Sequence, residues 1–228
     1  MATKRVTLTF DNGPTAAVTG SVLDVLRDAD VRSTFFVCGD QLCRPGAMDI
    51  ARRAVDEGHW IGNHAMDQPH RCRFGERDDP DLPAFQIGAT QELIGPLSHP
   101  DRLFRPPGCG GVLDRRLLSQ AAVDYLLVGG YTLVLWTNVP HDWDDPDGWV
   151  ERCWRDVERQ EWSVVVLHDL ANGAMPHLPR LIAELRAAGV ELRQDLPDFA
   201  VPIVRGTMRA SIDHLVAVTA SASGKGSP

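Results

Sequence analysis

Ionisable side chains gather in five short segments of the sequence. The segments are 11–14, 64–70, 105–108, 141–143 and 168–169. A carboxylate can take a proton from water, an imidazole can donate a proton to a departing amine, and an arginine can orient a carboxylate. Because the five segments together hold all three kinds of group, they predict the hydrolysis of an amide or an ester.

Each of these segments follows a run of residues that is typical of a buried β-strand. The predicted strands are 5–10, 33–38, 60–64, 103–105, 131–136 and 162–167, and helix-like runs lie between or after them at 18–28, 47–57, 86–97, 115–125, 146–160 and 176–188. Continuous apolar strands between helices favour a parallel sheet, and this number of units favours a barrel. Since chemistry in such barrels takes place at the carboxyl ends of the strands, we expect the five segments to meet in one pocket.

The composition is that of one globular domain. The chain has 228 residues, of which 43% are hydrophobic and 24% charged, and its five cysteines are scattered and expected to be free thiols. The formal net charge of −8 argues against a nucleic-acid partner. No apolar run reaches the roughly 20 residues of a membrane helix, and the first strand leaves no room for a signal peptide. The sequence therefore predicts a cytoplasmic protein without a membrane partner, and it makes no prediction of the oligomeric state.

The polar segments and the strands before them resemble, in this order, the sequence blocks of the polysaccharide deacetylase (NodB-homology) family. Residues 9–14 resemble Thr-Phe-Asp-Asp-Gly-Pro, 58–64 resemble Gly-His-x-Ile-Gly-Asn-His, 104–107 match the Arg-Pro-Pro block, 136–143 resemble the block ending in Asp-Trp, and 165–169 resemble the Leu-x-His block. The resemblance implies an α/β fold, a distorted (β/α)7-type barrel in a single domain. We expect this barrel to span residues 1–206 and residues 207–228 to form a C-terminal helix or tail.

The resemblance also implies roles for four residues. The family removes acetyl groups from N-acetylated sugars with the help of a divalent metal. By resemblance, Asp11 is the catalytic base and His168 is the general acid. Arg105 would orient Asp11, while Asp142 would orient His168 and tune its charge. Each pair is therefore expected to lie within hydrogen-bond distance, and the implied partner is a small-molecule or oligosaccharide substrate.

Two of the family's three metal-ligand positions are changed in this chain. The family uses the second Asp of the first block and two His in a His-x-x-x-His pair. Here Asn12 replaces the Asp and Gln68 replaces the second His, whereas His64 is kept. His70 lies two residues beyond Gln68 and would need a shift of the loop to substitute. Amide oxygens are poor zinc ligands, so the sequence predicts a damaged zinc-like site.

Three further residues are candidates for contact with the substrate. Trp143 and Pro107 belong to the matched blocks. Cys109 lies in the glycine-rich stretch 108–111, where the family usually has an aromatic residue and one glycine. This exchange is expected to open space beside the predicted pocket and to place a thiol near it.

Three functions are compatible with this set of residues. A deacetylase-type hydrolase acting on a small N-acylated sugar or a related metabolite follows from the retained acid and base. A metal-independent amidohydrolase acting on a cyclic amide or ureide follows from Asn12 and Gln68 beside that acid and base. An inactive carbohydrate-binding protein follows from the changed ligands alone, although the retention of Asp11 and His168 speaks against it.

Overall fold

One mixed sheet organises the structure, a computed structural model that describes residues 3–67, 74–77, 79–108 and 110–218. Its strands are β1 (Arg5–Asp11), β2 (Thr34–Val37), β3 (Trp60–Asn63), β4 (Leu103–Phe104), β5 (Thr132–Leu133), β6 (Trp162–His168), β7 (Glu191–Arg193), β8 (Ile203–Val204) and β9 (Thr207–Met208). The order in the sheet is β6-β1-β2-β3-β4-β5-β8-β9, and β7 pairs with β1. Strand pairs are parallel from β6 to β5, while β8 and β9 are antiparallel to their neighbours.

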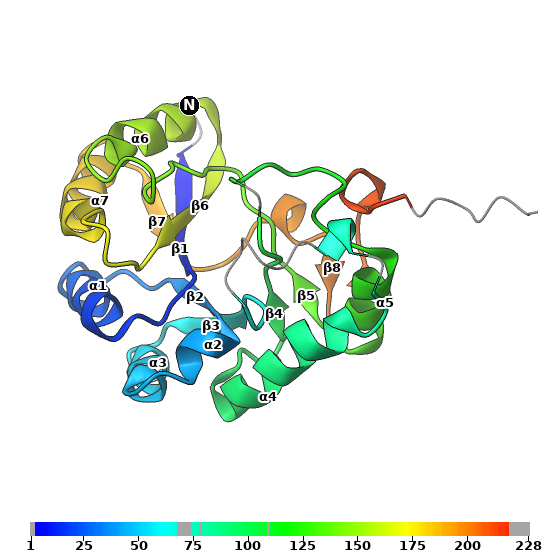
Figure 1. The fold of residues 1–228 in the computed structure, drawn as a ribbon. Coiled ribbons are helices and arrows are strands. Elements are labelled where there is room, and N and C mark those ends of the chain that lie inside the picture. Colours follow the sequence, from blue (N-terminus) through cyan, green and yellow to red (C-terminus); the bar gives the residue numbers. More distant parts are fainter. Residues whose placement is uncertain (1–2, 68–73, 78, 109, 219–228) are drawn as a thin grey trace, which may run out of the picture.

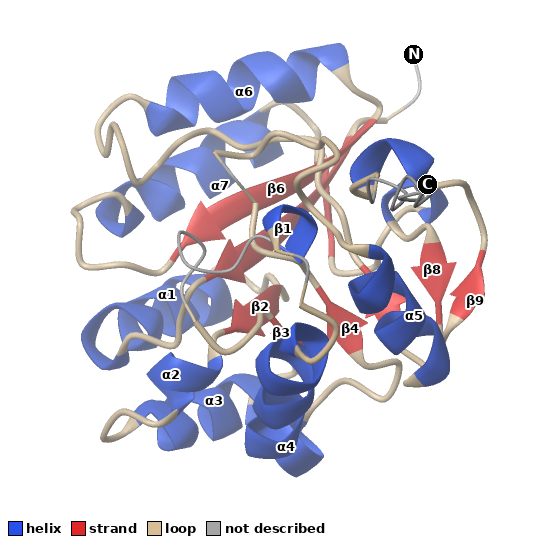
Figure 2. Ribbon diagram, turned by 45° about the vertical axis from the view of Figure 1, so that its right-hand side comes forward, coloured by secondary structure: helices blue, strands red, loops and turns tan. Residues whose placement is uncertain are grey.

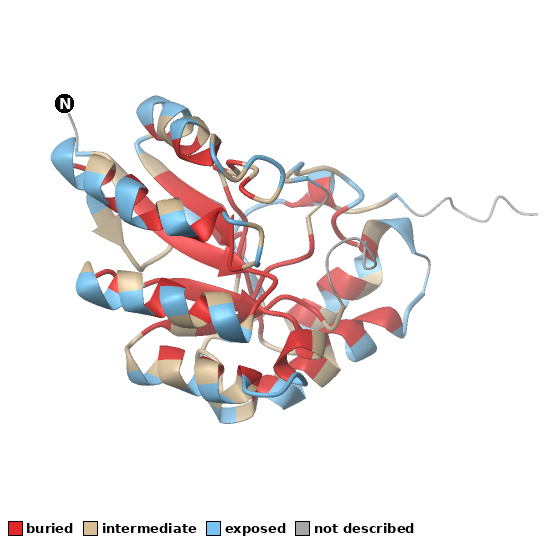
Figure 3. Cartoon of the chain, turned by 60° about the vertical axis from the view of Figure 1, so that its left-hand side comes forward, coloured by how far each residue is buried: buried red, intermediate tan, exposed pale blue. Residues whose placement is uncertain are grey.

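The helices lie around the outer side of the curled sheet (Figures 1 and 2). They are α1 (Ala16–Asp28), α2 (Gly39–Leu42), α3 (Ala47–Asp56), α4 (Ala89–Ile94), α5 (Gln120–Val128), α6 (Trp149–Arg159) and α7 (Leu178–Ala187). Figure 3 shows that the central strands are buried and that the helices expose only one face, whereas β7 is only partly buried and β9 is exposed. In α6, for example, Trp149, Cys153 and Val157 recur every four residues and are buried, which is the spacing of one helix face.

The sheet curls because the chain after β5 returns to β6. Asn138 forms a parallel bridge with Val165, and the amides of Thr137 and Asn138 both donate to the carbonyl of Val164 at 3.1 Å. The segment between β5 and Asn138 therefore leads from β5 to β6, which is the first strand in the sheet order. The predicted barrel fold is confirmed as a curled half-barrel, although the predicted strand 131–136 is regular only in β5.

Two predicted helices begin or end elsewhere than the hydrophobic spacing indicates. The helix predicted at 115–125 is α5, which begins later because the side chain of Ser119 accepts a hydrogen bond from the amide of Ala122 and caps it. The helix predicted at 86–97 is divided into η2 (Ala84–Gly88), α4 and η3 (Gly95–Leu97). Local caps and turns, rather than hydrophobic spacing, set these boundaries.

The chain after residue 206 continues the sheet. Met208 of β9 pairs with Ile203 of β8, and Val216 forms a bridge with Leu118. The predicted domain boundary thus falls between two paired strands. Among the described residues, no helix has the length and apolar character needed to cross a membrane.

Candidate active site

Asp11, the last residue of β1, lies against a buried arginine. One terminal nitrogen of Arg105 donates to Asp11 Oδ1 at 2.9 Å and to Thr9 Oγ1 at 2.6 Å. Arg105 directly follows β4, is fully buried, and its guanidinium lies 4.1 Å from the centre of the Phe36 ring. Burial lowers the pKa of Arg105, and the adjacent Asp11 carboxylate opposes this effect. The pair predicted from the sequence is therefore an ion pair inside the barrel, with Asp11 Oδ1 fixed in direction.

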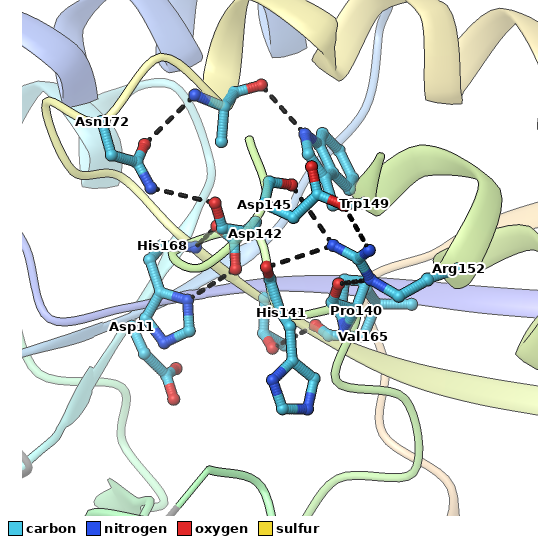
Figure 4. Close-up of polar contacts among 12 residues, drawn as sticks. Asp11, Pro140, His141, Asp142, Asp145, Trp149, Arg152, Val165, His168 and Asn172 are labelled. Carbon is cyan, nitrogen blue, oxygen red and sulfur yellow. Dashed lines mark hydrogen bonds and ion pairs between the residues drawn. The ribbon is translucent and has the colours of Figure 1, made fainter. Parts of the chain in front are cut away.

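His168, the last residue of β6, is the register partner of Asp11. Its Nδ1 lies 2.8 Å from Asp142 Oδ1, and its backbone amide donates to Asp142 Oδ2 at 2.8 Å. Burial alone would lower the pKa of His168, but the hydrogen bond to Asp142 and the nearby carboxylates outweigh it and raise this pKa. Figure 4 shows Asp142 on one side of the His168 ring and Asp11 on the other. Because Asp142 accepts at Nδ1, Nε2 is the nitrogen left to exchange a proton with a substrate.

Aromatic rings pack beside His168. The Trp143 ring meets the His168 ring edge-on at a centroid distance of 4.9 Å, and His141 packs against Trp143 at 4.6 Å. Trp143 and His141 are partly exposed, whereas Pro107 is buried in the loop that follows β4. Of the three predicted substrate contacts, Trp143 thus lies next to His168, and Cys109 lies outside the described residues.

His64 and Asn12, two of the predicted metal ligands, also lie next to Asp11. Nδ1 of His64 donates to the carbonyl of Arg105 at 2.9 Å, which leaves Nε2 facing Asp11 Oδ2 at 3.7 Å. Burial lowers the pKa of His64 and favours its neutral form. Asn12 has a left-handed backbone, with φ of 73°, and its Oδ1 lies 3.9 Å from the Cys38 thiol. His64 is therefore a neutral imidazole whose Nε2 faces the Asp11 carboxylate, and position 12 supplies an amide where the family has a second carboxylate.

These groups do not make up a zinc site by themselves. Within the described ranges, no three His, Cys, Asp or Glu side chains are grouped so that they could hold a metal ion. Gln68 and His70, the other two candidate ligands, lie outside those ranges. Zinc in proteins takes at least three nitrogen, sulfur or carboxylate ligands. The described donors therefore do not fit the metal that the family resemblance implies.

Asp169 is a buried carboxyl group that directly follows His168. Thr19 Oγ1 donates to Asp169 Oδ2, and Oδ1 has no hydrogen-bond partner among the described residues. Burial raises the pKa of Asp169 to about 6. A methyl group on Gly13 would collide with the Asp169 carboxyl group, so the turn after β1 rests directly on this group. Glycine at position 13 is required by this close approach.

Two residues near the site are absent from the prediction. Asn172 donates to the carbonyl of Asp142 at 3.0 Å, and Arg152 of α6 donates to the carbonyl of Pro140 at 2.7 Å. Both contacts reach backbone atoms, which accept hydrogen bonds whatever the local side chains are. The only signal in the sequence is that an arginine follows the Asp142 segment within a helix, and this signal is too common to be informative.

Comparison with known proteins identifies the family. The polysaccharide deacetylase model matches residues 1–126, more than half of the chain. The chain belongs to the polysaccharide deacetylase family. A peptidoglycan-N-acetylglucosamine deacetylase of Bacillus cereus, a member with a similar sequence, is 32% identical over 194 residues, which cover 82% of this chain and 84% of that protein. The predicted family is thus confirmed.

Two other similar proteins extend the comparison. Peptidoglycan-N-acetylglucosamine deacetylase PgdA of Listeria monocytogenes is 26% identical over 190 residues, 82% of this chain but only 37% of that protein, so this chain spans little more than a third of it. The family 4 carbohydrate esterase from Streptomyces lividans, solved in complex with acetate, superposes with a TM-score of 0.70 at 25% identity and covers 90% of this chain and 100% of its own. The folds of this esterase and of this chain therefore agree over most of the chain.

Proposed function

We propose that this protein is a hydrolase that removes an acetyl group from an N-acetylated sugar, with Asp11 as the base and His168 as the acid. The observation that carries the proposal is the pairing of Asp11 with His168 at the carboxyl ends of two adjacent strands. Each of the two has its own oppositely charged neighbour at hydrogen-bond distance. A base and an acid held side by side in this way can act on the two sides of one amide bond.

The two residues would move two protons during the reaction. Asp11 takes a proton from a water molecule as the water oxygen attacks the acetyl carbonyl. His168, whose raised pKa favours the imidazolium form, then gives a proton from Nε2 to the sugar nitrogen as the carbon–nitrogen bond breaks. The products are acetate and a free amine. Arg105 and Asp142 keep the two groups in position, and no step is assigned to a metal.

The substrate class rests on the relatives and on the ring beside His168. The Bacillus cereus and Listeria relatives are named as peptidoglycan-N-acetylglucosamine deacetylases. Trp143 is a partly exposed aromatic side chain next to His168, and such a side chain suits packing against a sugar ring. We therefore propose an N-acetylglucosamine unit, alone or in an oligosaccharide. The cytoplasmic location expected from the sequence stays a prediction.

Release of acetate from N-acetylated oligosaccharides tests the proposal. Purified protein is incubated with chitin oligosaccharides and with soluble peptidoglycan fragments, and acetate and free amine are measured. We expect Asp11→Asn and His168→Gln each to lower kcat by about 100-fold or more. Asp144→Asn, an exposed change in the turn that carries Asp142, is the matched control and should leave kcat unaltered. Equal turnover by all four proteins, or no acetate from any substrate, contradicts the proposal.

The need for a metal is measured in the same assay. One arm contains a chelator, and others contain added zinc or cobalt. Turnover that survives the chelator favours the metal-independent reaction, which Asn12 and the incomplete set of described ligands also favour. Binding of the oligosaccharides without turnover in any arm supports the inactive carbohydrate-binding alternative instead.

A further inference from the structure

The turn 140–145 carries the carboxylate that orients His168. Asp142 is fully buried, and both of its carboxylate oxygens accept hydrogen bonds from His168, one from the ring and one from the backbone amide. His141, directly before it, has a left-handed backbone with φ of 57°, a conformation that non-glycine residues adopt at an energetic cost. The position of Asp142 therefore depends on a turn that the local sequence does not favour by itself.

Arg152 of α6 contacts this turn at both of its ends. Its Nε donates to the carbonyl of Pro140 at 2.7 Å, and one terminal nitrogen lies 2.6 Å from Asp145 Oδ2. The other terminal nitrogen donates to the carbonyls of Asp145 at 3.2 Å and His141 at 3.4 Å. Figure 4 shows the guanidinium beside these acceptors and on the far side of the turn from His168. Arg152 thus connects the start, the left-handed residue and the end of the turn.

The contacts of Arg152 with the turn differ from those of an exposed ion pair. A single exposed pair contributes little to stability because water screens it. The Arg152 side chain is only 28% exposed, and three of its acceptors are carbonyl oxygens. The His141 carbonyl also accepts from the amides of Asp144 and Asp145, at 3.1 and 3.2 Å, so the main contributions of Arg152 are its contacts with Pro140 and Asp145. The hydrogen bond from Arg152 also lowers the pKa of Asp145. A planar group with several fixed donors suits this task, since it can bind several backbone oxygens at once.

We infer that Arg152 is a positioning residue for the acid, which acts through the turn 140–145 and Asp142 on His168. This inference rests on the proposed function, because it assigns His168 the role of acid. It makes a separate structural claim, however: without Arg152, Asp142 no longer holds the Nδ1 proton of His168 firmly. Asn172 holds the carbonyl of Asp142 from the opposite side and cannot replace the contacts at Pro140 and Asp145.

The test measures the hydrogen bond and the reaction separately. Protein labelled with 15N-histidine is studied by NMR, and the Nδ1 proton of His168 is assigned by its loss in His168→Gln. We expect Arg152→Ala to speed exchange of this proton with water roughly tenfold and to lower kcat roughly tenfold, with KM little changed, as for other groups that orient a functional imidazole. Arg152→Lys should restore part of both effects. Arg155→Ala, which removes an exposed arginine from the same helix, should change neither.

The outcomes separate this inference from the proposed function. An Nδ1 proton that exchanges in Arg152→Ala as in the unaltered protein overturns the inference, whether or not the protein releases acetate. Faster exchange in a protein that releases no acetate supports the structural claim and contradicts the proposed function instead. Asp145→Asn, a change at a half-exposed side chain, removes the charged acceptor only and should show the same effects at smaller size. If Arg152→Ala does not fold, unchanged exchange in both Asp145→Asn and Arg152→Lys overturns the inference.

Discussion

Asp11 and His168 are neighbours across one pair of strands, but different parts of the molecule hold them. Asp11 is bound by Arg105, which is fully buried and contacts Thr9 and the Phe36 ring inside the barrel. His168 is bound by Asp142, which lies on a turn outside the regular strands. Asp11 is thus positioned by the barrel interior and His168 by a connecting turn.

Because the two residues are held differently, we expect changes around them to affect different properties, namely the free energy of unfolding and kcat. A buried charge that loses its partner is costly, because neither water nor another charge can compensate it. A turn held by a partly exposed arginine can instead loosen while water takes over the open carbonyls. We therefore expect loss of Arg105, the partner of Asp11, to act mainly on folding, and changes at the groups that hold His168 to act mainly on kcat. The following changes test that division, beginning with the largest expected effect.

Arg105→Leu should destabilise the fold by about 3–5 kcal/mol, because it leaves the Asp11 carboxylate buried without its counter-charge. Urea unfolding followed by circular dichroism measures the change. The double variant Asp11→Asn/Arg105→Leu should lose clearly less than the sum of the two single variants. A loss below about 1 kcal/mol for Arg105→Leu would show that the barrel does not depend on this ion pair.

Asp142→Asn should lower kcat by about 100-fold, because His168 loses the charged acceptor that holds its proton. It should also alter the dependence of stability on pH. The pKa of folded His168 is raised, so its protonation stabilises the fold fully below about pH 6.5 and ceases to do so as the pH rises through the raised value. The free energy of unfolding that the variant loses should therefore be larger near pH 6 than near pH 9. A loss that is constant with pH would be inconsistent with the Asp142–His168 pair as described.

Gly13→Ala should destabilise the protein by about 2 kcal/mol, because the added methyl group meets the Asp169 carboxyl group beneath the turn after β1. Gly20→Ala in α1 is the control. The nearest atom to its new methyl group would lie 3.9 Å away, so this change should be neutral or stabilise the helix by up to about 1 kcal/mol. Thermal unfolding compares the two variants, and equal effects would contradict the close packing at Gly13.

Asn172→Ala should have the smallest effect, a loss of about 1 kcal/mol, because it removes one hydrogen bond to the Asp142 carbonyl and one from the Ala174 amide, while Arg152 still holds the turn. We expect kcat to fall only a few-fold, and steady-state acetate release measures it. A fall as large as that of Asp142→Asn would mean that Asn172, and not Arg152, positions the turn.

The candidate site was predictable to the extent that its residues end strands. Asp11, Arg105 and His168 directly follow or end β1, β4 and β6, so the periodicity of the strands places them at one end of the barrel. The family resemblance paired Asp11 with Arg105 and His168 with Asp142, and the structure shows both hydrogen bonds. Neither the strand periodicity nor the family resemblance yields a complete metal site. Gln68 and His70 lie outside the described residues, and the described side chains are too few to hold a metal ion.

The sequence by itself determined the family, the α/β alternation and the side chains that end each parallel strand, because these depend on local residue types and on hydrophobic spacing. Only the tertiary structure decided how the sheet closes through Asn138, how β8 and β9 extend it, and which distant groups hold the turn of Asp142. Arg152 reaches backbone carbonyls, and every residue of a chain except the last has such a carbonyl. Which of them an arginine binds is decided by packing, and no pattern of side chains records it.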